Sequence, residues 1–253
     1  MDPRPLETVT LVLPYYRQPL MLARQIKEWE AFPSGFRFIV VDDGSEEAAQ
    51  PIVEKASEQL RKRLKLYRVT VDIPWNRGGA RNLATREATT DWIIHIDTDH
   101  VLPAPAAYWL LAFRPAPDHW YRFRRWRQGR ADFTRKKDAI PPDVKFGEIK
   151  PHIDSYLIEV ASYWRVGGYD EDYSGCLGGG TAFLRRLEAV AGPPLIAPDP
   201  AVLHVYTTDL IADASVRTLS RDTVAGKDLA RRKQAGGAGA PLHPIRFPWV
   251  RVL

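Results

Sequence analysis

Two aspartates one residue apart, Asp97 and Asp99, are the residues whose type and spacing most clearly indicate chemistry. They follow the run Trp-Ile-Ile-His-Ile at 92–96, which is typical of a strand buried on both faces. Acids at positions i and i+2 at the end of such a strand point the same way, toward the sheet edge where open α/β folds bind ligands. Two hard oxygen donors there could bind Mg²⁺ or Mn²⁺, which in turn binds a diphosphate. The alternative is a strand end made soluble by acidic side chains.

The segments before this pair alternate between strand and helix patterns. The predicted strands cover residues 9–14, 36–42 and 64–71, and the predicted helices cover residues 22–29, 49–60 and 79–88. Strands that alternate with helices over short connections predict an α/β fold with a mostly parallel sheet flanked by helices. Because parallel strands all end at one edge of their sheet, residues 14–16, 42–43 and 97–99 should meet in one crevice.

The composition is that of a globular protein. Of the 253 residues, 45% are apolar and 26% are charged, and no run approaches the length of a transmembrane helix. The N-terminus lacks the basic and apolar regions of a signal peptide. The single cysteine, Cys176, excludes an internal disulfide and fits a reducing compartment. We therefore expect a cytoplasmic protein, and association with a membrane surface or a larger assembly stays open.

A basic segment lies within an expected insertion at 120–140. Between residues 122 and 137, eight arginines and lysines are accompanied by one acid, Asp132, and aromatic residues are interleaved with them. This pattern suits an anionic partner, such as nucleic acid, an acidic glycan or the diphosphate of a nucleotide or lipid carrier. A solvated insertion without a specific partner is the alternative.

Four motifs, in this order, resemble those of the family 2 glycosyltransferases of the GT-A fold. They are Leu-Val-Leu-Pro-Tyr at 11–15, Val-Val-Asp-Asp-Gly-Ser at 40–45, Asn-Arg-Gly-Gly-Ala-Arg-Asn at 76–82 and Ile-Asp-Thr-Asp at 96–99. A fifth, Trp-Arg-Val-Gly-Gly-Tyr-Asp-Glu at 164–171, is similar to the family's Gly-Gly-Phe-Asp-Glu segment. The resemblance implies a Rossmann-like GT-A sheet, a nucleotide-sugar donor, preferably a UDP-sugar, and Mn²⁺ or Mg²⁺ as cofactor.

The resemblance also implies roles for the first two motifs. Pro14 and Tyr15 would border the nucleotide base. Asp42 or Asp43 would accept a hydrogen bond from uracil, since an ionised carboxylate acts only as an acceptor. The structural alternative for the two aspartates is a capped turn.

The third motif is expected beside the base and the diphosphate. There Asn76 and Gly79 would belong to the nucleotide-binding segment, with glycine permitting a close approach of the backbone. Arg81 would stack on the base or fork onto phosphate oxygens. The alternatives are a plain turn for Gly79 and a helix-surface position for Arg81.

The fourth motif implies the metal site. Asp97 would face the ribose or a metal-bound water, and Asp99 would bind the metal directly. A histidine late in the chain often adds a ligand in this family, and His204 is the candidate with the best position. A hydrogen-bonded or solvent-facing His204 is the alternative.

The sequence departs from the family where the catalytic base is expected. An inverting transferase needs a carboxylate beside the acceptor hydroxyl, and the family places it at the start of a helix. Here that stretch reads Gly-Gly-Gly-Thr-Ala-Phe at 178–183, so Gly180 replaces the acid. The nearest acids are Asp170, Glu171 and Asp172, with Asp154 on the preceding strand, and we favour Asp172.

Two functions follow from this departure. If another acid serves, the chain transfers a sugar from a nucleotide donor to a glycan, lipid-linked or protein acceptor. If none does, it is a degenerate GT-A module that binds a glycan or nucleotide without turnover. A glycosyltransferase domain is expected over 1–205, with a nucleotide-binding half at 1–102 and an acceptor half at 103–205, and a C-terminal extension or lid over 206–253.

Overall fold

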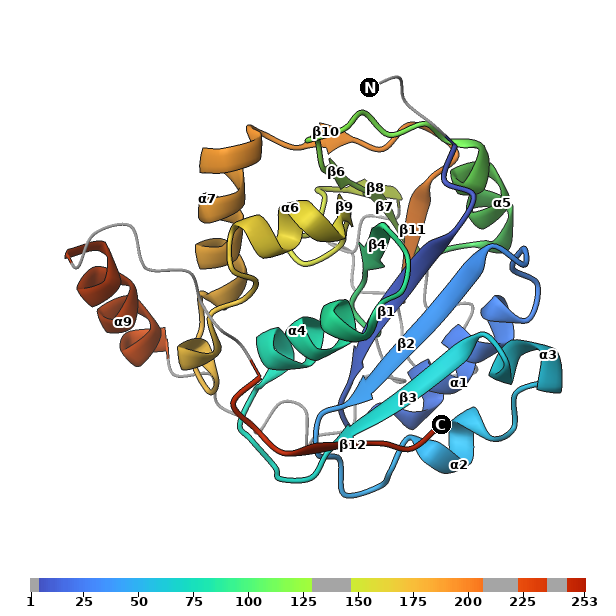
Figure 1. Ribbon diagram of the computed structural model, residues 1–253, viewed down its shortest axis with the longest axis horizontal. Helices are drawn as coiled ribbons and strands as arrows, with labels where there is room; N and C mark the ends of the chain where they lie inside the picture. Colours follow the sequence, from blue (N-terminus) through green and yellow to red (C-terminus); the bar gives the residue numbers. More distant parts are fainter. Residues whose placement is uncertain (1–4, 129–146, 207–222, 236–244) are drawn as a thin grey trace.

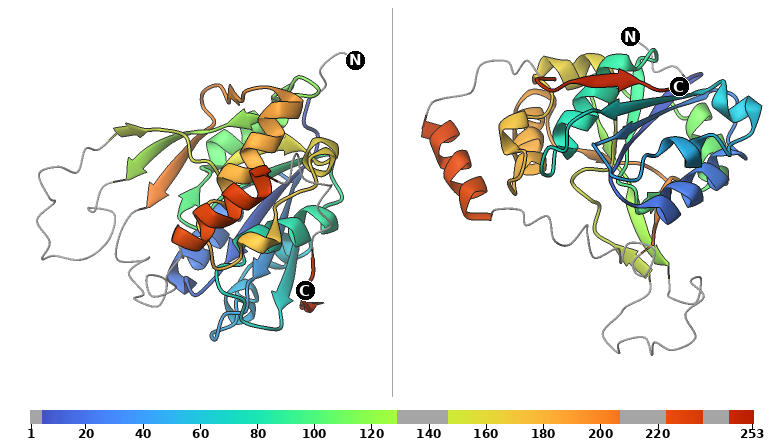
Figure 2. Two further views of the ribbon diagram at one scale, coloured as in Figure 1. Left: turned by 90° about the vertical axis from the view of Figure 1, so that its left-hand side faces the viewer. Right: turned by 90° about the horizontal axis from the view of Figure 1, so that it is seen from below.

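An eight-stranded β-sheet runs through the centre of the molecule (Figures 1 and 2). The computed structural model describes residues 5–128, 147–206, 223–235 and 245–253. The order of the strands in this sheet is β10-β6-β9-β4-β1-β2-β3-β12. Their bounds are β1 (Val9–Tyr15), β2 (Phe36–Asp42), β3 (Leu64–Val69), β4 (Trp92–His95), β6 (Tyr121–Arg122), β9 (Tyr156–Glu159), β10 (Leu195–Ile196) and β12 (Trp249–Arg251).

Strands β1 to β4 are parallel neighbours, and they place the functional residues. β1 pairs with β2 and β4, and β2 pairs with β3, all in parallel. Strands β9 and β12 run antiparallel to β4 and β3. The mostly parallel α/β sheet expected from the sequence is thereby confirmed. β1 is buried along its whole length, as its continuous apolar run predicts.

Helices cover both faces of the sheet because the side chains of each strand alternate between the faces. Leu11 and Leu13 contribute to one core, and Val12 contributes to the other. The first core includes residues of α1 (Pro19–Trp29), α2 (Gln50–Val53), α3 (Glu58–Arg61) and α5 (Ala104–Ala112). The second includes residues of α4 (Arg77–Glu87), α6 (Val160–Arg165) and α7 (Gly179–Ala191). Figure 2 shows α1 and α4 on opposite sides of the sheet.

A four-stranded sheet lies beside the main one and contains part of the basic segment. Its strands are β5 (His100–Val101), β11 (Val202–Tyr206), β7 (Arg124–Gln128) and β8 (Gly147–Ile149). Arg122 donates to the carbonyl oxygen of Pro151 at 2.7 Å, and Arg124 forms an ion pair with Asp199. These arginines of the segment therefore have partners within the chain, while residues 129–146 lie outside the described residues.

The described parts of the C-terminal extension join the rest of the fold. β12 pairs with β3, and the Trp249 ring packs edge-on against Tyr67. The helix α9 (Thr223–Ala235) lies near the start of α7. The remaining parts of the expected lid, 207–222 and 236–244, lie outside the described residues. Among the described helices, none combines the length and the apolar character that crossing a membrane requires.

Candidate active site

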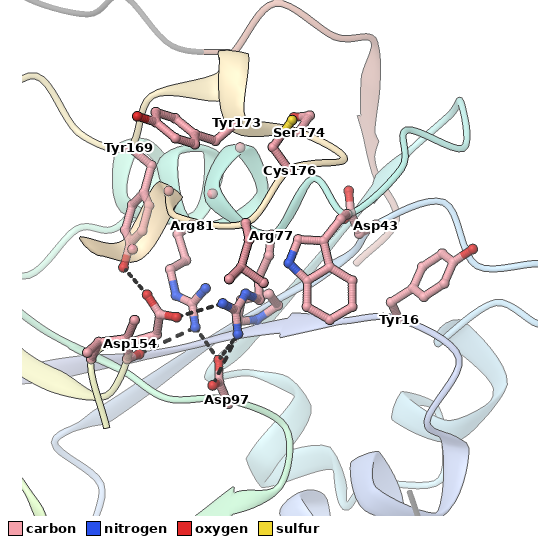
Figure 3. Close-up of a pocket in the computed structure, with 18 of the residues that line it drawn as sticks. Tyr16, Asp43, Arg77, Arg81, Asp97, Asp154, Tyr169, Tyr173, Ser174 and Cys176 are labelled. Atoms are coloured by element: carbon pink, nitrogen blue, oxygen red, sulfur yellow. Dashed lines mark hydrogen bonds and ion pairs between the residues drawn. The ribbon is translucent and has the colours of Figure 1, made fainter. Parts of the chain in front are cut away.

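A cavity of about 460 Å³ opens at the edge where β1, β2 and β4 end. The end of β1 contributes Tyr15 to its lining, and the loops after β2 and β4 contribute Asp43 and Asp99. The start of α4, the loop before β9 and the segment before α7 complete the wall. Aspartates 43 and 99, far apart in sequence, thus reach the same cavity, as the parallel topology predicts. Figure 3 shows the side chains that face it.

The structure separates the two aspartates at the end of β2. Asp42 accepts hydrogen bonds from the backbone amides of Ser45 and Ala49 at 2.9 and 3.0 Å, so it holds the turn after the strand. Asp43 lines the cavity and accepts a hydrogen bond from Asn76 Nδ2 at 3.0 Å. Of the two candidates, Asp43 is therefore the one that can contact a ligand, and Asn76 orients it.

Gly79 lies where no side chain fits. A Cβ atom there would come within 2.2 Å of Asn76 Oδ1 and 2.6 Å of Phe247 Cε1. The glycine thus allows α4 to pack against the asparagine that orients Asp43 and against the C-terminal segment. Gly79 also lines the cavity. The absence of a side chain can therefore serve both the packing of α4 and the close approach of a ligand to the backbone.

Burial raises the pKa of Asp43 to about 7, and the nearby charges of Asp42 and Asp72 act in the same direction, against the hydrogen bond from Asn76. The ionised carboxylate is the stronger acceptor for a ring N–H of a nucleotide base, because a hydrogen bond to a charged acceptor is about twice as strong as a neutral one. We expect nucleotide affinity to fall about tenfold between pH 8 and pH 6, because the ionised fraction falls by that factor. Calorimetric titration across this range measures the change. Retention of full affinity at the lower pH would contradict the assignment of Asp43.

An ion-pair network crosses the floor of the cavity (Figure 3). Asp97 pairs with Arg81, and Arg77 Nη1 lies 3.3 Å from Asp97 Oδ2. Arg77 Nη2 also donates to Asp154 Oδ2 at 2.7 Å. Burial raises the pKa of Asp97, but Arg77 and Arg81 more than offset this effect and hold the pKa well below its ordinary value. Asp97 is therefore ionised, and two guanidinium groups line a site suited to a diphosphate.

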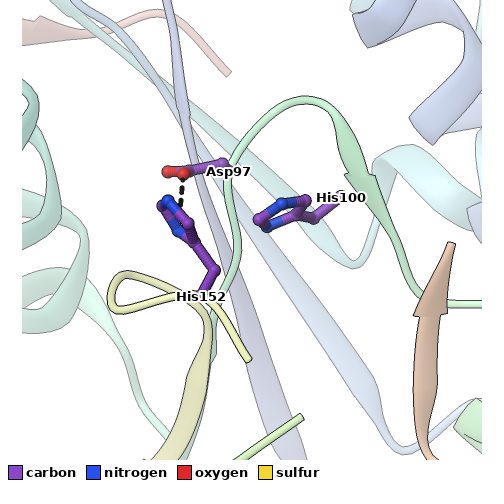
Figure 4. Close-up of side chains that lie close together, drawn as sticks. All are labelled: Asp97, His100 and His152. Atoms are coloured by element: carbon purple, nitrogen blue, oxygen red, sulfur yellow. Dashed lines mark ion pairs between the residues drawn. The ribbon is translucent and has the colours of Figure 1, made fainter. Parts of the chain in front are cut away.

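Two histidines complete a group that could hold a metal ion (Figure 4). Ligand atoms of Asp97, His100 and His152 all lie within 4.8 Å of one another. Burial lowers the pKa of His100 to about 4 and also lowers the pKa of His152. Both rings are therefore neutral at neutral pH, the form that binds metals. An arginine and a serine already contact the two ring nitrogens of His100, so the carboxylate of Asp97 is the donor of this group that suits Mn²⁺ or Mg²⁺.

Asp99 is the second acid of this site. It lines the cavity and, in the described ranges, forms no hydrogen bond or ion pair with another side chain. Burial and then the charge of Asp97 raise the pKa of Asp99 to about 6. A carboxylate that burial makes costly to ionise gains from a bound cation, so Asp99 also fits a divalent metal.

The structure places His204 elsewhere. It lies on β11, opposite Val101 of β5 in the four-stranded sheet, and it is neither in the cavity lining nor in the described cluster of possible ligands. His204 therefore lies outside the cavity lining, and His100 and His152 are the histidines that the structure brings close to Asp97. On an extended chain the ring of His100 would point away from its neighbour Asp99, but the loop after β4 brings it close to Asp97.

The structure also places the three acids that were candidate bases. Asp172 does not line the cavity; it pairs with Lys233 of α9 at 2.6 Å and Arg246 at 3.1 Å. Asp170 lines the cavity but is paired with Lys233 at 2.5 Å. Glu171 accepts hydrogen bonds from the backbone amides of residues 245 and 246. These contacts hold the C-terminal segments, and Asp172, the favoured candidate for the base, lies outside the cavity lining.

The Glu171 contacts give a stability prediction. Glu171→Ala is expected to lower the free energy of unfolding by about 2 kcal/mol, because backbone amides lose a charged acceptor. Chemical denaturation measures this difference, with Glu188→Ala, at an exposed residue of α7, as the control. If stability is unchanged while sugar transfer is lost, Glu171 has a catalytic role instead.

Known proteins resemble this chain in sequence and in fold. The family model described as glycosyl transferase family 2 matches residues 10–153. The chain belongs to this family. The match ends inside the loop before β9, so it includes β2 and β4, most of β1, and the loops after these strands that line the cavity.

The known members that the chain resembles are longer. It is 24% identical over 227 residues to validoxylamine A glucosyltransferase of Streptomyces hygroscopicus subsp. limoneus, covering 75% of this chain and 49% of that protein. S. aureus TarS 1-349 in complex with UDP-GlcNAc has 17% identity and a TM-score of 0.58, covering 80% of this chain and 59% of that one. Mannosyltransferase PcManGT from Pyrobaculum calidifontis, with GDP-Man and Mn²⁺, has 18% identity and a TM-score of 0.52, covering 81% and 57%. Both structures share the GT-A fold with this chain.

Three residues of the site were not identified from the sequence. Trp75, Arg77 and His152 all line the cavity. Arg77 lies within the motif at 76–82, and the position of that motif at the start of α4 is the signal that could have found it. No spacing rule links Trp75 or His152 to the acids.

Proposed function

We propose that the chain transfers a sugar from a nucleotide-diphosphate donor, a UDP-sugar, to an acceptor hydroxyl with inversion at the anomeric carbon. The observation that carries the proposal is the convergence of Asp43, Arg77, Arg81 and Asp99 on one cavity. Such a donor requires a hydrogen-bond acceptor for the base N–H, cationic groups for the diphosphate and a carboxylate for the metal ion. Asp43, the two arginines and Asp99 would supply these groups in turn.

Each half of the cavity would bind one part of the donor. Asp43, with Pro14 and Tyr15 beside it, would accept the ring N–H of uracil. Arg81 is buried, and its Nε and Nη1 atoms have no hydrogen-bond partner in the described structure. Together with Arg77 it would neutralise the phosphate oxygens, which carry the negative charge that grows as the bond to the sugar breaks.

Asp97 and Asp99 would hold Mn²⁺ or Mg²⁺, with the rings of His100 and His152 nearby. A divalent ion bound there would supply further stabilisation of the diphosphate leaving group. A carboxylate offers about four lone-pair positions. Two arginines already contact Asp97 and occupy some of these positions, so Asp99 is the more available ligand.

A donor screen tests the proposal. The protein is incubated with UDP- and GDP-sugars, with and without Mn²⁺, and release of UDP or GDP is measured. We expect Mn²⁺-dependent release from a UDP-sugar, strongly reduced in Asp43→Ala and unchanged in Glu46→Ala, whose side chain is 84% exposed.

The alternative outcomes are distinct. Nucleotide binding without release from any donor would establish the degenerate binding module instead. If neither binding nor release occurs with any nucleotide, the proposed function is wrong.

A further inference from the structure

The start of α7 carries no acid, yet a carboxylate occupies the space beside it. The first turn of the helix contains no acidic residue and no side-chain cap. A Cβ atom built on Gly180 would lie 2.5 Å from Asp154 Oδ1 and 3.1 Å from Asp154 Cγ. The carboxyl group of Asp154, which comes from the loop before β9, therefore fills the volume that a side chain at position 180 would need.

Most other acids that line the cavity have a different task. Asp43 faces the nucleotide side and Asp97 is held by two arginines, whereas Asp170 and Glu171 hold the C-terminal segments. Asp99 is the candidate metal ligand. Asp154 is left as the carboxylate on the side of the cavity formed by the segment before β9 and the start of α7.

We propose that Asp154 is the general base of the transfer reaction, an inference that rests on the proposed function. The acceptor oxygen would form its bond to the anomeric carbon while Asp154 takes the hydroxyl proton. The bond from that carbon to the phosphate oxygen breaks, and its electron pair leaves with the nucleotide diphosphate. Sugar, proton and charge are then all accounted for, and no further reactant is needed.

The surroundings of Asp154 orient its carboxylate. Tyr169 Oη donates to Asp154 Oδ1 at 2.9 Å, and Tyr156 Oη donates to Tyr169 Oη at 3.1 Å. Burial raises the pKa of both phenols well above the ordinary value, so they remain donors. The amino end of α7 also favours negative charge beside it. The contacts with Tyr169 and Arg77 thereby keep the Asp154 carboxylate in one position.

Arg77 explains how a fully buried carboxylate can reach an acceptor. Its guanidinium group covers Asp154 and bridges it to Asp97, and its own side chain is 30% exposed. A bound diphosphate carries more negative charge than one carboxylate and competes for this arginine. Movement of Arg77 to the diphosphate would uncover Asp154 Oδ2 at the moment when the donor is in place.

The first test separates binding from transfer. Wild type and Asp154→Asn are compared for UDP affinity by calorimetry and for consumption of the preferred UDP-sugar with water as acceptor. We expect the two dissociation constants to agree within about threefold, while consumption falls about 10²–10⁴-fold, as for loss of a general base. Asp118→Asn, at a surface ion pair with Arg165, is the matched control.

The second test moves the carboxylate. Gly180→Asp alone should lower the melting temperature, because its new side chain meets Asp154 and adds a like charge. The double variant Asp154→Gly, Gly180→Asp should remove this penalty and restore part of the donor consumption that Asp154→Gly loses. The melting temperatures of the single and double variants form a double-mutant cycle, which tests the contact between positions 154 and 180 without an activity assay.

Each outcome decides between the two claims. If Asp154→Asn consumes donor as fast as wild type and Asp118→Asn do, the base assignment is wrong and the proposed function stands. If Asp154→Asn also loses UDP affinity, Asp154 is a donor-binding residue and the assignment is again wrong. If wild type neither binds UDP nor consumes any UDP-sugar, the proposed function fails, and the assignment of Asp154 fails with it.

Discussion

Replacing Arg81 by leucine is expected to lower the free energy of unfolding by about 3–5 kcal/mol, the usual cost of removing one partner of a buried ion pair. Arg81 is fully buried and pairs with Asp97. Burial alone lowers the pKa of Arg81, but Asp97 and its other neighbours raise it above the ordinary value, so the guanidinium is charged. Without it, Asp97 would keep its negative charge in the interior, with Arg77 as the nearest compensating charge.

The matched control for this substitution lies on the same helix. Arg86→Leu removes a guanidinium that is 43% exposed and pairs with Glu87, so we expect a loss of at most about 1 kcal/mol. Urea denaturation monitored by far-ultraviolet circular dichroism compares the two variants. Equal losses for both would mean that the Arg81–Asp97 pair does not stabilise the fold.

Replacing Asp99 by asparagine is expected to reduce sugar transfer about 10²–10³-fold, the effect of removing one group that stabilises charge at a reaction centre. The variant should fold at least as well as the wild type. Burial and Asp97 raise the pKa of Asp99 to about 6, so its charge at neutral pH is a cost that the amide does not carry. Loss of activity without loss of stability is the specific prediction.

Asp91→Asn controls for this substitution, because Asp91 is exposed and immediately precedes the same strand, β4. Donor consumption is measured for both variants over a range of Mn²⁺ concentrations. Activity in Asp99→Asn equal to that of Asp91→Asn would remove Asp99 from the metal site, and the cluster around Asp97 would have to bind the metal without it.

The fold was predictable because its determinants are local. The apolar runs that become β1 and β2 are continuous, and Leu22, Ile26 and Trp29 form the buried stripe of α1. Alternation of such elements then restricts the chain to a parallel sheet. The convergence of Asp43 and Asp99 on one cavity followed from strand direction alone.

The parts of the site that could not be predicted depend on contacts between distant segments. Asp172 is close in sequence to the glycine turn at 167–168, but Lys233 and Arg246 reach it from the C-terminal segments. Spacing likewise could not show that Asp154 fills the volume beside Gly180. From the sequence, Asp154 is only one of several candidate acids, because a glycine does not indicate which neighbouring residue fills the space beside it.

The histidines illustrate the same limit. An extended chain would point His100 away from its neighbouring acid, but the chain after β4 turns before β5 begins. His152 lies in a loop far along the sequence, and its Nδ1 atom is 3.1 Å from Asp97 Oδ2. The choice of His204 rested on family position, and the pairing of β11 with β5 places that residue in the second sheet.

Calorimetric titration of UDP into the protein, with and without Mn²⁺, tests the nucleotide-binding site most directly. We expect saturable binding that Mn²⁺ strengthens, with Asp43→Ala weakening affinity in both conditions and Asp99→Asn abolishing only the gain from Mn²⁺. Equal affinities in wild type and Asp43→Ala, or binding that Mn²⁺ strengthens equally with and without Asp99, would contradict a nucleotide diphosphate site built on these two acids.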